Sequence, residues 1–178
     1  IPHKLSMRAS VTSELVLDDV RLPDSAVLPG VVGLRGPLSC LNEARFGIVF
    51  GVLGAGRDCL EATIDYAINR EQFGRPIAGF QLTQRKLADM ALELDKAALL
   101  AARLGRLKDS GKISPIQISL GKLNNCRVAL DIARTCRTVM GANGISLEYV
   151  PLRHANNLES VITYEGTEEV HALSGGRA

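Results

Sequence analysis

The sequence predicts a mainly α-helical protein, an up-and-down helical bundle preceded by short β-strands. Three long stretches, 37–70, 82–110 and 115–140, carry apolar residues at helical spacing. The connections between them are short, which favours antiparallel packing of consecutive helices. The chain has 178 residues, of which 46% are apolar. That is enough for one folded domain with a sizeable core, which we place at 37–178.

Residues 1–36 differ in pattern from the rest of the chain. Apolar and polar residues alternate from Lys4 to Leu17, as expected for strands with one buried face. Asp18-Asp19, Pro23-Asp24 and Pro29-Gly30 then supply turn residues. We expect two short strands and a linker here.

The helix boundaries follow from capping residues. Ser39 is a plausible N-cap for the first helix, and Gly111 is placed to end the second. The third helix is expected to begin at Pro115, where proline suits the first turn, and to end at Gly141. A fourth helix is expected to begin around Glu165. No internal repeat or low-complexity segment is present.

Composition argues against two classes of function. The net charge is only +2 and the aromatic content is 4%, so there is neither a basic stripe nor a stacking platform for nucleic acid. The longest apolar stretch, around Ile48 to Leu53, is interrupted by glycines and is much shorter than the about 20 residues that span a bilayer. We expect neither nucleic-acid binding nor membrane insertion.

The cysteine and histidine positions indicate no metal site. No Cys-x-x-Cys pair is formed by the four cysteines, and the three histidines are far apart in the sequence. We interpret Cys40, Cys59, Cys126 and Cys136 as reduced thiols of the core. A reducing compartment fits this interpretation, either the cytoplasm or, in a eukaryote, the mitochondrial matrix.

Residues 163–171, Thr-Tyr-Glu-Gly-Thr-Glu-Glu-Val-His, contain the leading catalytic candidate, Glu165. A carboxylate that removes a carbon-bound proton benefits from partial desolvation and from a mobile, glycine-flanked backbone. The aromatic ring of Tyr164 and the following Gly166 offer both. Taken alone, the peptide also fits a helix N-terminus at which a carboxylate is favoured by the helix dipole.

Further motifs occur in the same order as in one known family. They are Arg-Glu-Gln-Phe-Gly at 70–74, Met-Gly-Ala-Asn-Gly-Ile at 140–145 and Arg-His-Ala-Asn-Asn-Leu-Glu at 153–159. Together with 163–171 they resemble the acyl-CoA dehydrogenases, and 153–159 with Asn-Asn-Cys at 124–126 resembles the glutaryl-CoA dehydrogenase branch. Family members have an N-terminal helical domain and a middle β-domain before the helical domain. The resemblance implies a C-terminal portion, with residues 1–36 as a remnant of the middle β-domain and a linker.

The resemblance also implies a reaction and its partners. Glu165 would remove the α-proton of an acyl-CoA thioester while FAD accepts the β-hydrogen as hydride. Glutaryl-CoA would be oxidised and decarboxylated to crotonyl-CoA and CO2, with electron-transferring flavoprotein as acceptor and a homotetramer as the assembly. A general short-chain acyl-CoA dehydrogenase is the second candidate. A non-catalytic helical assembly module is the third.

Residues of this chain that match cofactor-binding positions of the family are Arg70, Phe73, Gln81, Gly141, Gly144 and Thr167. Arginine suits a pyrophosphate and an aromatic ring packs on the cofactor, and by resemblance Arg70 and Phe73 would meet the FAD of a neighbouring subunit. Structural alternatives exist for each: a helix-ending arginine, a core phenylalanine, an exposed cap at Gln81, and C-capping by the glycines.

Three residues match substrate-binding positions. Tyr164 would line the acyl pocket, while Arg45 and Asn42 would lie near the CoA moiety. The alternatives are a half-buried packing tyrosine and a solvated or salt-bridged arginine. We assign no proton-transfer role to His154 or His171.

Overall fold

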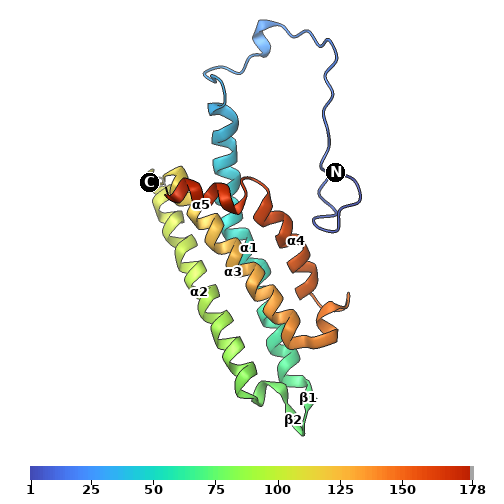
Figure 1. The fold of residues 1–178 in the computed structure, drawn as a ribbon. Helices are drawn as coiled ribbons and strands as arrows, with labels where there is room; N and C mark the ends of the chain where they lie inside the picture. Colours follow the sequence, from blue (N-terminus) through green and yellow to red (C-terminus); the bar gives the residue numbers. More distant parts are fainter. Residues whose placement is uncertain (177–178) are drawn as a thin grey trace.

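The computed structural model describes residues 1–176 as a helical bundle (Figure 1). The helices are α1 (Arg35–Asn69), α2 (Gln81–Asp109), α3 (Pro115–Met140), α4 (Pro151–Thr163) and α5 (Glu168–Gly176). Three short 3-10 helices are also present, η1 (Asp24–Ala26), η2 (Ile77–Gly79) and η3 (Gly141–Ile145), together with a two-stranded antiparallel hairpin, β1 (Glu71–Gln72) and β2 (Arg75–Pro76).

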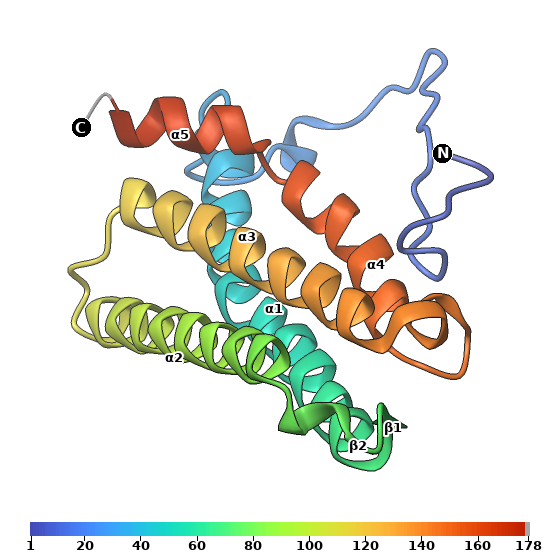
Figure 2. The same cartoon turned by 60° about the horizontal axis from the view of Figure 1, so that its bottom comes forward.

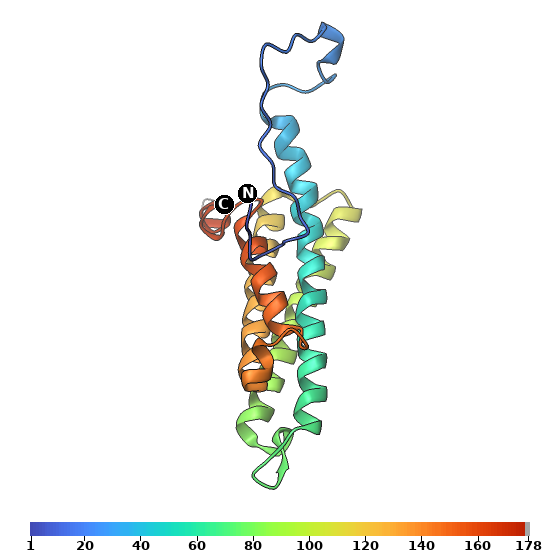
Figure 3. The same cartoon turned by 90° about the vertical axis from the view of Figure 1, so that its right-hand side faces the viewer.

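Helices α1 to α4 lie alongside one another, and α5 crosses the end of the bundle opposite to the β1–β2 hairpin (Figures 1 and 2). The first turns of α1 extend beyond the bundle, and the segment 1–34 runs back outside it toward α4 (Figure 3). There, Asn157 of α4 accepts a hydrogen bond from the Met7 backbone N–H at 2.9 Å. The core therefore belongs to residues 35–176.

Helix α3 is the central element, since it contacts α1, α2, α4 and α5. A capping box starts it: the Ser114 hydroxyl accepts from the Gln117 N–H, and the Gln117 side chain accepts from the Ser114 N–H. With Pro115 in its first turn, the helix begins where the sequence predicted. The main core cluster joins α3 to the other long helices through Val52, Cys59, Met90, Leu94, Cys126, Ala129, Ile132, Ala133, Leu158 and Val161.

The strands predicted between Lys4 and Leu17 are not formed. This segment is irregular and extended, and Val11, Leu15 and Leu17 are exposed. A strand needs a hydrogen-bonding neighbour, and within residues 1–176 none lies beside this segment. The strands that do form lie at 71–76, where Phe73 and Gly74, both with positive φ, make the two-residue turn.

The fourth helix was placed wrongly from the sequence. Two helices occupy the C-terminal region: α4, which the sequence analysis missed, and α5, which begins at Glu168 rather than at Glu165. Because 153–157 is mostly polar, the sequence analysis did not recognise the buried apolar face of α4. That face includes Ala155, Leu158 and Val161. Glu165 and Gly166 have φ of 59° and 99°, so the chain leaves helical geometry there.

By length and composition alone, α1 is the one helix within residues 1–176 that is suited to cross a membrane, and 11% of its most apolar window is buried in this structure. Along α1, Val49, Val52, Cys59 and Leu60 are buried against the neighbouring helices. The absence of membrane insertion stays a prediction.

All four cysteines are free thiols, but only three belong to the core. Cys40 is exposed near the start of α1, which corrects the expectation that it is buried. Burial raises the pKa of the Cys59 thiol to about 12 and those of Cys126 and Cys136 to about 11. Within residues 1–176, no three His, Cys, Asp or Glu side chains gather as metal ligands would.

We predict that a neutral alkylating reagent modifies one thiol of the native chain at pH 7.5, namely Cys40, because the other three are buried and protonated. Mass spectrometry after timed quenching measures the extent. Cys40→Ser is the matched control and should remain unmodified until denaturant is added. Rapid native modification of Cys59, Cys126 or Cys136 would contradict the packing.

Candidate active site

The loop 164–167, between α4 and α5, carries Glu165 in a conformation that L-residues rarely adopt. Its φ is 59°, and the following Gly166 has φ 99°. A Cβ at Gly166 would lie 2.8 Å from Cε1 of His171, so the loop packs against that ring as only glycine allows. Non-glycine residues in this region are uncommon and concentrate at functional sites.

Two cations hold the backbone of this loop. Lys122 of α3 donates from Nζ to the carbonyl oxygens of Tyr164 at 2.5 Å and Gly166 at 2.8 Å. Arg45 of α1 donates from Nε to the carbonyl oxygen of Glu165 at 2.6 Å. Three successive carbonyls therefore accept hydrogen bonds from buried or half-buried cationic side chains.

The Glu165 carboxylate has one oxygen atom that forms no hydrogen bond within residues 1–176. This oxygen, Oε2, is buried. Buried polar atoms are nearly always hydrogen-bonded, so an orphaned carboxylate oxygen calls for an explanation. A carboxylate that must accept a proton from a substrate needs such a free oxygen. The role of Glu165 as a general base stays a prediction.

Tyr164 lies beside this carboxylate and is 38% exposed. Burial of part of the ring, with Cys126 and Glu165 nearby, raises the pKa of its hydroxyl. The Lys122 ammonium lies 5.7 Å from the ring centroid. Tyr164 is therefore a neutral wall of the site at physiological pH.

An apolar groove of about 380 Å³ runs between α1 and α4 and ends at Tyr164. Its floor on α1 is formed by small residues, Ala44, Gly47 and Gly51, and a Cβ added at either glycine would meet no atom within 4 Å. Ile48, Leu158 and Val161 supply apolar walls. A second cavity of about 620 Å³, between the N-terminal segment and α4, is lined by both Tyr164 and Glu165.

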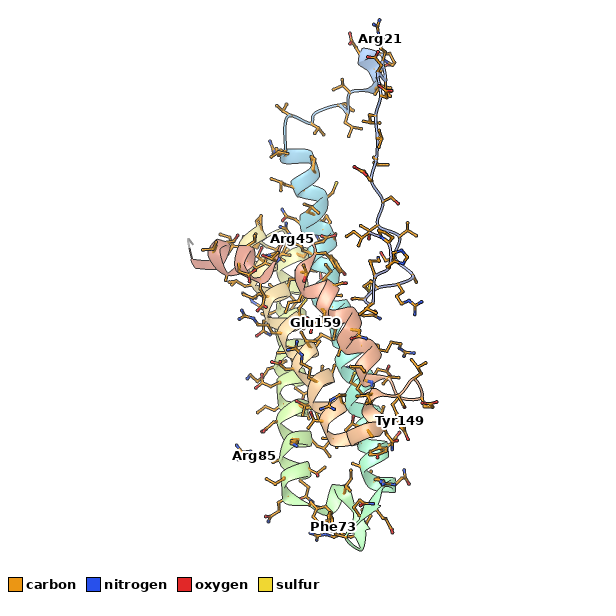
Figure 4. All side chains as sticks on the ribbon, turned by 45° about the vertical axis from the view of Figure 1, so that its right-hand side comes forward. Arg21, Arg45, Phe73, Arg85, Tyr149 and Glu159 are labelled. Atoms are coloured by element: carbon orange, nitrogen blue, oxygen red, sulfur yellow. The ribbon has the colours of Figure 1, made fainter. Side chains whose placement is uncertain are left out.

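The predicted substrate residues lie at this end of the bundle. Arg45, labelled in Figure 4, is on α1 next to the α4–α5 loop, and its Nη1 donates to the Asn42 side-chain oxygen at 3.3 Å. The Arg45 guanidinium thus donates hydrogen bonds to Glu165 and Asn42. A contact of either residue with CoA stays a prediction.

Thr167 also lies in the loop, where its hydroxyl accepts from the Val170 N–H at 3.4 Å and caps α5. This is a structural role that the sequence did not reveal. Its proposed contact with FAD stays a prediction.

The other predicted cofactor residues, Arg70, Phe73, Gln81, Gly141 and Gly144, lie at the opposite end of the bundle, around the β1–β2 hairpin and η3 (Figures 1 and 4). Phe73 is 92% exposed, not a core residue, and its φ is 53°. Arg70 and Gln81 are exposed as well. The contact of Phe73, Arg70 and Gln81 with FAD stays a prediction.

The two glycines of η3 have structural reasons of their own. Gly141 caps α3 with φ 59°. At Gly144 a Cβ would lie 2.5 Å from the Arg137 carbonyl oxygen, so the loop returns against α3 too closely for any side chain. Asn143 fastens this loop to α1 by donating to the Tyr66 hydroxyl at 2.9 Å.

The predicted site residues therefore form two clusters. Arg45 near one end and Arg70 at the other end of α1 are separated by roughly 37 Å at about 1.5 Å per residue. The residues that the sequence assigned to one cofactor therefore lie at opposite ends of the bundle.

Sequence reasoning missed Lys122, which is 1% exposed, and the packing role of His171, which is 2% exposed. A signal for Lys122 was present: it falls in the apolar stripe of α3, four residues from both Ile118 and Cys126. A lysine on such a stripe is either a packing defect or a buried, hydrogen-bonded cation. No comparable pattern marks His171.

Comparison with known proteins agrees with the helical fold. Residues 32–178 match the family model described as acyl-CoA dehydrogenase, C-terminal domain. This chain belongs to the acyl-CoA dehydrogenase family.

The chain is also similar to individual proteins of this family. The chain is 68% identical to a crystal structure of glutaryl-CoA dehydrogenase from Mycobacterium smegmatis, with a TM-score of 0.97 over 99% of this chain and 46% of that one. A crystal structure of a glutaryl-CoA dehydrogenase from Mycobacterium smegmatis in complex with FADH2 is 67% identical, with a TM-score of 0.96 over 99% of this chain and 46% of that one. Human mitochondrial short-chain specific acyl-CoA dehydrogenase is 35% identical over 96% of this chain and 42% of that protein. The chain thus spans less than half the length of these relatives.

We predict that protonation of His171 destabilises the folded protein. Burial lowers its pKa from 6.5, and the neighbouring cations Lys122 and Arg45 lower it further. As pH falls below about 6.5, the unfolded chain binds this proton before the folded chain does, so the free energy of unfolding decreases, by up to about 1.4 kcal/mol per pH unit.

Urea denaturation from pH 8 to pH 5 measures this effect. His171→Gln should lose this part of the pH dependence, whereas His3→Gln, at an exposed residue of the N-terminal segment, should keep it. Parallel profiles for wild type and His171→Gln would show that His171 is not the group responsible.

Proposed function

We propose that this chain is the part of an FAD-dependent glutaryl-CoA dehydrogenase that carries the catalytic base, and that the enzyme oxidises glutaryl-CoA and decarboxylates the product to crotonyl-CoA and CO2. The observation that carries the proposal is the buried, unpartnered Oε2 of Glu165, at a loop where an apolar groove ends. Family membership and the 68% identity to a glutaryl-CoA dehydrogenase support it.

The residues of this chain have separate tasks in that reaction. Glu165 takes the α-proton of the thioester onto its free carboxylate oxygen. Tyr164 and the α1–α4 groove hold the acyl chain and keep water away from the reacting carbons. Bound FAD supplies the acceptor for the β-hydrogen, which leaves as hydride. The α-proton and the β-hydride thus leave the substrate on different acceptors.

The cofactor site requires more than one subunit under this proposal. Phe73, Arg70 and Gln81 are exposed together at the hairpin end, where a planar cation and an aromatic ring suit the phosphate and ring portions of FAD. The distance to Glu165 means that these residues meet the FAD of a neighbouring subunit. The proposed assembly is therefore a homo-oligomer, a tetramer by resemblance to the family.

The groove fits a short acyl chain, and a general short-chain acyl-CoA dehydrogenase remains the second candidate because of the 35% identity to the human enzyme. Recognition of the distal carboxylate of glutaryl-CoA is assigned to residues outside this chain. Electron-transferring flavoprotein is the proposed acceptor, and the cytoplasm or the mitochondrial matrix the proposed compartment.

We predict that Glu165→Gln in the full-length, FAD-loaded protein lowers the rate of flavin reduction by about 10²–10⁴-fold while leaving FAD content unchanged, because the amide keeps the shape but cannot accept the proton. Stopped-flow loss of flavin absorbance measures the rate. Glu169→Gln, at an exposed carboxylate in the first turn of α5, is the matched control and should retain the wild-type rate. Undiminished flavin reduction by Glu165→Gln would exclude Glu165 as the base.

We predict that the wild-type, full-length protein turns over glutaryl-CoA with a higher kcat/KM than butyryl-CoA and releases CO2 from glutaryl-CoA. Electron-acceptor reduction and carbon dioxide release are measured in parallel. Preference for butyryl-CoA would replace the first candidate by the short-chain enzyme. Absence of turnover with both would remove the dehydrogenase proposal for these substrates.

A further inference from the structure

The ammonium group of Lys122 is buried without a salt-bridge partner among the described residues, although the charge of Glu165 lies near enough to favour it. The Lys122 side chain is 1% exposed, and no carboxylate within residues 1–176 forms a salt bridge with it. Burial lowers the pKa of Lys122, which reflects the cost of holding the charge in this place. A methionine of similar length would fill the space without that cost. Packing therefore does not explain the charge.

The role of the charge follows from the groups that accept hydrogen bonds from Lys122. Its hydrogen bonds go to the carbonyls of Tyr164 and Gly166, which belong to the peptide groups that precede Glu165 and follow Gly166. Arg45 holds the carbonyl of Glu165 itself, on the peptide group in between. One lysine thus fixes the chain on both sides of the proposed base.

The same contacts determine where the Glu165 N–H points. No cis peptide bond occurs among the described residues, and in a trans peptide the C=O and N–H point in opposite directions. Because the Tyr164 carbonyl points at Lys122, the N–H of Glu165 points away from α3. A cation on the carbonyl also polarises the peptide and strengthens that N–H as a donor.

The conformation of Glu165 needs such a restraint. Its φ of 59° is disfavoured for a residue with a Cβ, so an unrestrained loop would relax toward other conformations and move the carboxylate. The Oε2 atom of Glu165 accepts no hydrogen bond within residues 1–176 that would hold the side chain. The backbone contacts of Lys122 and Arg45 are what keep the carboxylate in place.

We infer that Lys122 is a positioning residue for catalysis: its buried ammonium holds the peptide groups around Glu165 so that carboxylate and backbone N–H meet the substrate in a fixed geometry. The inference rests on the proposed function, in which Glu165 is the base. A purely structural role, in which Lys122 only tethers the α4–α5 loop to α3, makes a different prediction for the measurements below.

The test compares Lys122→Met, Lys122→Gln and Lys122→Arg in the full-length, FAD-loaded protein. Met and Gln remove the charge, and Arg keeps it with altered geometry. Lys96→Met, at an exposed lysine of α2 that pairs with Glu93, is the matched control. Flavin reduction per bound FAD is measured by stopped flow over a range of acyl-CoA concentrations, together with KM, FAD content and Tm.

We expect Lys122→Met and Lys122→Gln to lower the flavin reduction rate at saturating substrate by about 10- to 100-fold per bound FAD, because small displacements of a catalytic group have effects of this size. KM should change less than about threefold, and the rate of Lys122→Arg should lie between wild type and Gln. Lys96→Met should match wild type.

Several outcomes would overturn the inference. A lower Tm or FAD content with an unchanged rate per bound FAD would show that Lys122 is only structural. Equal rates for the Arg and Gln variants would show that the charge has no catalytic effect. If the Met variant does not fold, this comparison between Arg and Gln still tests the inference. A wild-type protein whose flavin no acyl-CoA reduces would instead refute the proposed function, so the two failures are distinguishable.

Discussion

The buried polar side chains of α3 hold this bundle in register. Asn125 is fully buried and donates from its amide to the carbonyls of Val49 in α1, at 2.9 Å, and Ala97 in α2, at 3.2 Å. One side chain therefore joins three helices at one level through two buried hydrogen bonds. Lys122 lies one turn earlier on the same face of the helix and reaches the α4–α5 loop. The core and the candidate site thus share one scaffold.

This arrangement explains how a disfavoured loop conformation is maintained. Helix α3 supplies Lys122, α1 supplies Arg45, and α5 returns the His171 ring against Gly166. An ion pair between Arg127 of α3 and Glu168 of α5 fastens the far side of the loop. Rigid helices hold a short loop from three sides, which is how a catalytic group is kept in a fixed position without being paired itself.

The length of the helices has a consequence for the cofactor. Because α1 runs almost the whole length of the bundle, it separates the cluster at Glu165 from the cluster at Phe73 (Figure 4). Phe73 is 92% exposed at the tip of the hairpin, and within residues 1–176 its ring meets only the edge of Phe80, at 6.2 Å between centroids. An assembly that brings the hairpin of one subunit to the cofactor of another would cover this ring, in line with the proposed homo-oligomer.

Local sequence signals pointed to the peptide around Glu165 but not to the side chains that hold its backbone. The sequence pointed to Glu165 and Tyr164. It predicted that Arg45 lies near the CoA moiety, but it did not reveal the hydrogen bond that Arg45 donates to the Glu165 carbonyl. Lys122 was overlooked because a lysine is usually solvated, and only its burial reveals the difference. Phe73 was weighed as a core residue, whereas it is exposed. Contacts between residues far apart in the chain leave little trace in local patterns.

The sequence by itself determined the three long helices, since each helix satisfies its backbone hydrogen bonds within its own segment. For α3, the local residues Ser114, Pro115 and Gly141 also start and end the helix. Only the tertiary structure decided the rest: the failure of 4–17 to form strands, the presence of α4, and the left-handed backbone at Glu165. A strand needs a neighbour, a short helix needs a surface to pack on, and a disfavoured φ needs external bonds to hold it. Each of these depends on groups supplied by other parts of the fold.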